Sequence, residues 1–327
     1  MNKKLTLFLF IMAISNWTNA ADKIKKLDIV REFPTEAQML KGGFALGQGI
    51  KFDILENKIY FCSQFECKLI VFDLDGNYLT TIGSPGQGPG DFNWPLNIFA
   101  YRKSIYISDN GNARIQILSG NGDFERQIKI INVLHDFVIV NDKIFLSCFD
   151  KTSQIDRVHA SIFKIFDLNG NLLKNISGPF KAIYDNYVYN NSVTLRIDNV
   201  NIHCLQKYGT TYRVYNENGE LQREFSLNKN PLDDKKYKKI KYKGAYVTFC
   251  VYDSIIYATY AGRGELIIDA FNMDGQYICS YSATQKDEEI YLVSDMKVLE
   301  YNGKKYLYLL IDQPDIYFAV AAIENKS

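Results

Sequence analysis

Short apolar segments with strand character recur along this chain and alternate with polar loops. The clearest copies begin at Ile59, Ile105, Ile144, Ile202, Ile256 and Leu307, spaced 39 to 58 residues apart. β-Branched and aromatic residues dominate these segments, as is typical of β-strands. A sheet built from one such unit cannot bury both of its faces, so six copies predict six stacked sheets in a closed ring.

A glycine turn follows the third strand in five of the six units. Each turn has an Asp or Asn directly before its glycine, and the glycines are Gly76, Gly122, Gly170, Gly219 and Gly275. Glycine supplies the positive φ that a tight hairpin needs. Some of these segments resemble a calcium-binding loop, but an EF-hand needs glycine at position six and glutamate at position twelve. The spacing therefore favours hairpin turns.

The sixth unit ends without a fourth strand, because the chain stops at Ser327 soon after the third. Residues 24–32 alternate between apolar and polar positions and belong to no other unit. We expect this N-terminal strand to fill the empty outer place of the last sheet, which would remove an open edge from the ring. The prediction is an all-β fold: a six-bladed β-propeller of four-stranded antiparallel blades, forming one domain over residues 21–327.

Residues 1–20 differ in kind from the rest of the chain. Lys3 and Lys4 precede an apolar run over residues 5–14, and small residues lead to a cleavage point near Ala20. This layout predicts a secretory signal peptide, because the run is too short for a membrane-spanning helix. An uncleaved anchor is the alternative. We expect a periplasmic or secreted protein with no transmembrane segment in the mature chain.

Composition adds constraints rather than an activity. The 327 residues include 38 basic and 37 acidic side chains, a formal net charge of +1. A nucleic-acid-binding domain would favour a strongly basic balance, so no nucleic-acid partner is expected. The six cysteines show no disulfide framework; Cys62 and Cys67 either face each other across a hairpin or are buried as small apolar residues, and the second is favoured. We expect a monomer.

One stretch carries a family resemblance. The glycine-rich residues 83–95 lead into the Ile105 unit, which continues with Ser108, Asp109, Asn112 and Arg114. This pattern resembles the NHL repeat, and more narrowly the secreted bacterial six-bladed propellers related to NHL proteins. The resemblance implies the fold; a propeller is a scaffold, and its function must be argued from a site.

The innermost strands are expected to line a central channel. Counting eight residues back from the second strand of each unit, with a longer turn allowed in the sixth, gives polar residues in otherwise apolar strands. These positions are Lys51, Asn97, Asp136, Thr194, Thr248 and Asp295. They form a candidate ligand-binding ring around the axis.

The same ring allows a metal alternative. Asn97, Asp136 and Asp295 offer the oxygen ligands that calcium prefers, and lactonase-type six-bladed propellers hold a central calcium of this sort. Calcium takes six or more oxygens, however, and only two carboxylates are present. Solvated polar residues in a wet channel are therefore favoured, and no cofactor is predicted, with calcium as the possibility left open.

Four further residues join the candidate set. Trp94 is a candidate for stacking at one mouth of the ring, because tryptophan combines apolar area with a polar group. His135, beside Asp136, is the only plausible acid–base residue. Arg114 and Arg263 occupy corresponding polar loops of two units. A lysine-rich stretch at residues 232–243 is either a binding loop or a solvated one.

These patterns favour an exported, non-catalytic propeller that binds a protein, peptide or glycan at one mouth of the ring. The alternative is a metal-assisted hydrolase or lyase with its site at the central channel. A third possibility is a structural interaction module in an envelope complex. An enzyme is less favoured because the sequence lacks a Gly-x-Ser-x-Gly elbow and a set of several histidines.

Overall fold

The computed structural model describes most of the chain. The described residues are 24–46, 51–130, 134–148, 161–178, 180, 192–207, 209–227, 246–260, 262–263, 265–284, 290–313 and 315–323. The predicted signal peptide, residues 1–20, and the lysine-rich stretch at 232–243 lie outside them. In the part of the chain that is described, no helix is long and apolar enough to cross a membrane.

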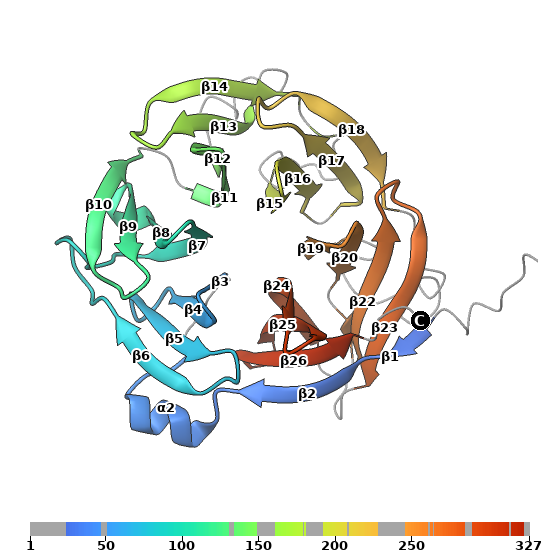
Figure 1. Cartoon of the computed structure of the whole chain (residues 1–327), viewed down its shortest axis with the longest axis horizontal. Helices are drawn as coiled ribbons and strands as arrows, with labels where there is room; N and C mark the ends of the chain where they lie inside the picture. The colour runs from blue at the N-terminus through green and yellow to red at the C-terminus, as the bar shows by residue number, and fades with distance from the viewer. Residues whose placement is uncertain are drawn as a thin grey trace, which may run out of the picture.

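Six sheets, each with four antiparallel strands, surround a common centre, as the six-bladed prediction requires (Figure 1). Blade 1 is β3 (Phe52–Leu55), β4 (Lys58–Ser63), β5 (Lys68–Asp73) and β6 (Tyr78–Ile82), and blade 2 is β7 (Pro95–Tyr101), β8 (Ser104–Asp109), β9 (Arg114–Ser119) and β10 (Phe124–Lys129). Blade 3 is β11 (Leu134–Val140), β12 (Lys143–Cys148), β13 (Ser161–Asp167) and β14 (Leu172–Ser177), and blade 4 is β15 (Val193–Asp198), β16 (Asn201–Gln206), β17 (Thr211–Tyr215) and β18 (Leu221–Ser226).

The last two blades each gain a fifth strand. Blade 5 is β19 (Thr248–Tyr252), β20 (Ile255–Thr259), β22 (Glu265–Asn272) and β23 (Tyr277–Thr284), with β1 (Ile24–Lys26) at its outer edge. Blade 6 is β24 (Ile290–Tyr301), β25 (Lys304–Gln313), β26 (Tyr317–Ile323) and β2 (Asp28–Phe33), with the short β21 (Gly262–Arg263) beside β24. Each of the six predicted apolar segments is a second strand of its blade.

The core lies between blades, where the apolar faces of neighbouring sheets meet. Tyr60 and Val71 of blade 1, for example, belong to one buried cluster with Ile105 of blade 2. Outer strands are much more exposed than second and third strands, as in β14, where Ile176 is the one buried residue. Because every cluster needs two blades, burial stabilises the ring as a whole rather than single sheets.

The predicted glycine turns are confirmed. All five glycines have positive φ and join the third strand to the fourth. At Gly122, whose φ is 94°, the backbone N–H donates to the Ser119 carbonyl at 2.9 Å. At Gly76 an added Cβ would lie 2.5 Å from the Phe33 ring, so glycine is needed there for space as well as for conformation. The polar side chains of these segments serve the hairpins.

The N-terminal strand closes the ring, as predicted, but it serves two blades. Strand β2 pairs with β26 and supplies the missing outer strand of blade 6, whereas β1 runs parallel to β23 of blade 5 (Figure 1). The division falls at Leu27, which is 2% exposed and packs into the cluster between these blades. The burial of Leu27 therefore fixes the point at which the N-terminal chain passes from blade 5 to blade 6.

Helix α2 (Glu36–Gly42) follows β2 on the outside of blade 1 and is an element that the strand pattern did not predict (Figure 1). Its start has a sequence signal nonetheless: Thr35 and Gln38 form a reciprocal capping box. Cys62 and Cys67 are both free thiols, the former buried, so the pair forms no disulfide in this structure.

Replacing Phe33, the last residue of β2, should destabilise the closed ring. Phe33 is 3% exposed and stacks on Phe318 with ring centroids 4.9 Å apart. We expect Phe33→Ala to lower the free energy of unfolding by about 3–5 kcal/mol, as for other buried aromatic truncations. Val30→Ala, on the exposed side of the same strand, should change it by about 0.5 kcal/mol or less. Urea denaturation measures both, and equal effects would contradict the closure role of β2.

Candidate binding site at the centre of the ring

The six polar residues predicted to face the axis all lie on the innermost strands or directly before them. They are Lys51, Asn97, Asp136, Thr194, Thr248 and Asp295, and each is at most 6% exposed. Inner strands that start at one mouth and run to the other bring these positions to a common level. The six therefore form a buried layer, which we call the polar ring, rather than a set of solvated side chains.

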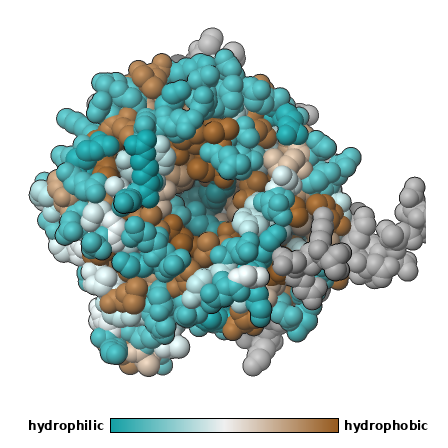
Figure 2. Space-filling model, viewed as in Figure 1, coloured by the Kyte–Doolittle hydropathy of each residue, from teal (hydrophilic) through white to brown (hydrophobic). Residues whose placement is uncertain are grey.

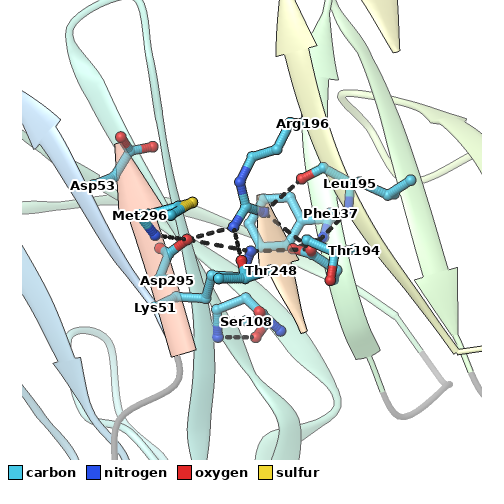
Figure 3. A network of polar contacts seen from close by, with 12 residues as sticks. Lys51, Asp53, Ser108, Phe137, Thr194, Leu195, Arg196, Thr248, Asp295 and Met296 are labelled. Atoms are coloured by element: carbon cyan, nitrogen blue, oxygen red, sulfur yellow. Dashed lines mark hydrogen bonds and ion pairs between the residues drawn. The ribbon is translucent and has the colours of Figure 1, made fainter. Parts of the chain in front are cut away.

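Charges in the polar ring pair across the axis (Figure 3). The Lys51 ammonium of blade 1 lies 3.0 Å from the Asp136 carboxylate of blade 3 and 3.9 Å from that of Asp295 in blade 6. Arg196 of β15 donates to Asp295 and to the Thr248 hydroxyl, and its guanidinium lies 3.4 Å from Asp136. Two cations, two carboxylates and the Thr248 hydroxyl thus connect five of the six blades.

Arg196 was missed by the sequence reasoning. It follows the ring residue Thr194 by two positions, so its side chain leaves the strand on the same side and reaches back to the ring. A signal was present: an arginine within an apolar inner strand, at i+2 from a predicted channel residue. Asp53 follows Lys51, and Lys297 follows Asp295, by the same two positions. The side chains of Asp53 and Lys297 pair at 3.0 Å.

The aspartates also join neighbouring inner strands through backbone hydrogen bonds. Asp136 accepts from the backbone N–H of Leu195 in blade 4 at 2.9 Å, and Asp295 accepts from that of Phe52 in blade 1 at 3.1 Å. Asp53 makes the equivalent bond to Ala100 of blade 2 at 2.8 Å. Each carboxylate also accepts from the N–H of the residue that follows it. These carboxylates therefore have a structural role in aligning blades.

Burial and ion pairing have opposite effects on the pKa values of Asp136 and Lys51. Burial alone would raise the pKa of Asp136, but Lys51, Arg196 and the Leu195 N–H outweigh it and hold the pKa below its ordinary value. Burial, with help from Arg196, lowers the pKa of Lys51 to about 8, against the opposing effect of the two aspartates. At neutral pH the network is an ion-pair cluster.

A cavity of about 180 Å³ lies at the centre of the ring. The ring residues Lys51, Asp136 and Asp295 line it, and its other lining residues, such as Val138 and Lys297, follow ring positions along the inner strands. The cavity therefore extends from the polar ring toward the mouth at which the inner strands end. On the face shown in Figure 2, hydrophilic residues line a central hollow and hydrophobic residues lie around it.

The proposed calcium ligands do not fit a calcium ion in this arrangement. Asp136 and Asp295 already accept from Lys51, Arg196 and backbone N–H groups, and Asn97 is 1% exposed and does not line the cavity. Among the described residues, no group of three His, Cys, Asp or Glu side chains could hold a metal ion. Calcium is the alternative left open rather than the prediction, and an ion here would have to compete with Lys51 and Arg196 for the two carboxylates.

Trp94 lies on the other side of the polar ring. It directly precedes β7, so it stands at the mouth where the inner strands begin. Its side chain is 50% exposed and its backbone is left-handed, with φ of 55°. A bulky residue with positive φ is strained and persists only when its surroundings hold it there.

Arg114 fixes the loop that leads to Trp94. It is 8% exposed and donates to the carbonyls of Gly88 and Asp91 at 2.9 and 3.0 Å, and to the Asp109 carboxylate at 2.7 Å. Asp109 accepts in turn from the backbone N–H of Asn93, the neighbour of Trp94, at 2.6 Å. The residues that carry the NHL resemblance therefore position a loop.

The two remaining candidates are described only in their backbone. His135 lies in β11 and Arg263 in β21, and the side chains of both lie outside the described part of the structure. His203, in contrast, is fully buried in β16, where its Nδ1 shares a hydrogen bond with the Tyr212 hydroxyl at 2.9 Å and its Nε2 lies 3.0 Å from the Asp198 carboxylate.

Comparison with known proteins agrees with this architecture. The family DUF5128, described as a 6-bladed beta-propeller, matches residues 44–261. The chain belongs to this family. No curated protein matches it.

Solved structures extend the likeness over the whole ring. An exported protein of Bacteroides fragilis has a TM-score of 0.61 at 13% identity, covering 94% of this chain and 98% of that one. A DUF4221 member from Bacteroides vulgatus has 0.60 at 14%, covering 92% and 99%. Streptogramin B lyase has 0.50 at 11%, covering 90% and 97%. At these identities the likeness shows the fold alone.

Removing one carboxylate of the polar ring should destabilise this DUF5128 protein strongly. Asp295→Ala removes the carboxylate that Arg196 and the backbone N–H groups of Phe52 and Met296 donate to, and breaking a buried ion pair costs about 3–5 kcal/mol. Asp274→Ala is the control, because Asp274 pairs with Arg223 at 3.2 Å but its side chain is 73% exposed. It should cost about 1 kcal/mol or less. Similar losses in both variants by urea denaturation would contradict a central role for the ring.

The contribution of Asp136 should depend on pH. Its folded-state pKa is lowered, so the unfolded state binds more protons between the two pKa values, and the stabilisation is lost as pH falls through the folded pKa. We expect Asp136→Asn to be much less stable than wild type at pH 7 and the difference to shrink below about pH 4. Urea unfolding at several pH values measures it. A difference that stays constant from pH 7 to pH 3 would show that the carboxylate charge is not what stabilises the ring.

Proposed function

We propose that this protein is an exported, monomeric, non-catalytic binding module that holds a glycan or peptide at the mouth where the inner strands begin. The observation that carries the proposal is Trp94, a half-exposed indole in a strained, left-handed backbone. Strain of this kind costs about 1–3 kcal/mol and clusters at ligand-binding sites. An indole offers a flat apolar face for stacking and an N–H for hydrogen bonding.

The surroundings of Trp94 support recognition rather than catalysis. Arg114 makes four hydrogen bonds from its guanidinium, two of them to loop carbonyls and two to side chains of the neighbouring strands. The indole is therefore presented on a loop that is already fixed, without a large ordering cost on binding. Phe65, 69% exposed, lies in the β4–β5 loop on the same face of the ring. The carboxylates that a metal-assisted hydrolase would use are engaged in aligning blades.

Export and the NHL relation belong to the same proposal. The positive end, apolar run and small-residue cleavage site of residues 1–20 support a signal peptide, and the Bacteroides fragilis neighbour is described as exported. The buried Asp109–Arg114 pair, at 2.7 Å, gives the NHL-like residues a shared physical purpose.

Fluorescence can test the proposal directly, because the chain has two tryptophans and Trp17 lies in the predicted signal peptide. Trp94 is then the sole tryptophan of a chain that starts at residue 21. Arabinoxylan, pectin, chondroitin sulfate and a tryptic casein digest serve as probes. We expect at least one to change the Trp94 emission. Calorimetric titration with that probe should then show that Trp94→Ala weakens binding by about tenfold or more, the loss of roughly one aromatic contact.

Leu173→Ala is the matched control, since Leu173 is 52% exposed on the outer strand β14. It should leave binding unchanged, and the melting temperature of both variants should stay near that of wild type. Binding that survives Trp94→Ala would contradict the assignment of this mouth, and no response to any of the four probes would contradict glycan and peptide as the ligand class.

A further inference from the structure

The cavity on the far side of the polar ring from Trp94 has unused hydrogen-bond donors but no unused carboxylate. Its charged lining residues are three cations, Lys51, Arg196 and Lys297, and two anions, Asp136 and Asp295. The carboxylates of this set already accept hydrogen bonds from the protein, whereas some donors of the cations have no acceptor in the described part of the chain. This difference decides which ligand suits the cavity.

Every oxygen of both carboxylates already accepts a hydrogen bond. Asp136 Oδ2 accepts from Lys51 at 3.0 Å and from the Leu195 N–H at 2.9 Å, and Oδ1 accepts from the next backbone N–H at 2.9 Å. Asp295 Oδ1 accepts from Arg196 and from the next N–H, and Oδ2 accepts from the N–H of Phe52 at 3.1 Å. A cationic ligand would have to compete with these partners and would lie beside the positive charges of Lys51 and Arg196.

The donors are engaged only in part. Arg196 is 8% exposed, its two terminal nitrogens are bonded, and its Nε is buried with no acceptor among the described residues. A buried donor left without a partner costs about 1–3 kcal/mol. Lys297 donates to Asp53 at 3.0 Å, which leaves two of its three protons, and its side chain is 25% exposed. Both residues line the cavity.

The rest of the wall is apolar. Phe99, Val138 and Val251 come from three different blades, and the neutral thiol of Cys250, whose pKa burial raises to about 12, adds to this surface. A cavity of about 180 Å³ accepts a group of a few heavy atoms. The combination of free cationic donors with apolar walls suits an anion that carries a small apolar group.

We propose that this cavity binds a carboxylate attached to a small apolar group, with Arg196 Nε and Lys297 as the donors. The carboxylate belongs either to a free short-chain acid or to the C-terminus of a peptide with a small apolar last residue. This inference does not rest on the Trp94 site, which lies at the opposite mouth.

Calorimetric titration of the folded chain starting at residue 21 tests the proposal. The probes are butyrate, with butyramide as its neutral counterpart, and acetyl-Gly-Gly-Val with a free or an amidated C-terminus. We expect butyrate, the free peptide or both to bind at concentrations up to about 10 mM, a range that detects fragment-sized ligands. Butyrate alone would identify a free acid and the peptide alone a chain terminus; the amides should not bind.

Two variants locate the site. Arg196→Lys keeps the charge but removes the Nε donor, and Lys297→Met removes the second donor without touching the four-charge network. Each should weaken binding by about tenfold or more, the loss of one charged hydrogen bond. Lys305→Met is the matched control, because Lys305 is 24% exposed and pairs with Asp253 at 3.1 Å outside the cavity.

The result that overturns the proposal is equally specific. If neither carboxylate binds, if the amides bind as well as the acids, or if Lys297→Met binds like Lys305→Met, the cavity is not a carboxylate site. Should Arg196→Lys fail to fold, Lys297→Met alone decides, since its side chain is partly exposed and its loss leaves Asp53 bonded to two backbone N–H groups.

Discussion

Four charges at the axis hold this ring together. Lys51 and Arg196 face Asp136 and Asp295 where the blades converge, and each carboxylate also bonds the backbone of the next blade. Buried ion pairs stabilise little in total, because desolvation offsets most of their attraction. Their value here is geometric: a charge left without its partner is so costly that the blades are confined to one relative arrangement.

The ring must also be closed at its outer rim, where the last blade meets the first. A ring of sheets has one joint where the chain does not run on, and an open edge there would expose unpaired backbone groups. Strand β2 supplies the outer strand of blade 6, and Phe33 at its end packs into the cluster between blade 6 and blade 1. Closure at the rim and alignment at the axis together make six marginal sheets into one cooperative unit.

Because the charged residues at the centre align the blades, the candidate ligand sites lie at the two mouths of the ring. The ring residues are committed to structure, so they separate the channel into two ends with different chemistry. One end presents an indole on a loop fixed by Arg114, and the other presents cationic donors in an apolar cavity. A scaffold of this kind can change ligands by changing mouth residues while the charged centre stays the same.

The sequence by itself determined the strand units, their number, the glycine turns and the closing role of the N-terminus, because those follow from local periodicity and from the φ that a hairpin demands. It also placed six polar residues at one level of the channel, since a strand repeats every two residues. Only the tertiary structure decided that Arg196 completes their charge balance, that Leu27 divides the N-terminal strand between two blades, and that Arg114 serves a loop. Those outcomes depend on which side chains meet across different blades, and no local pattern in one strand encodes a partner two blades away.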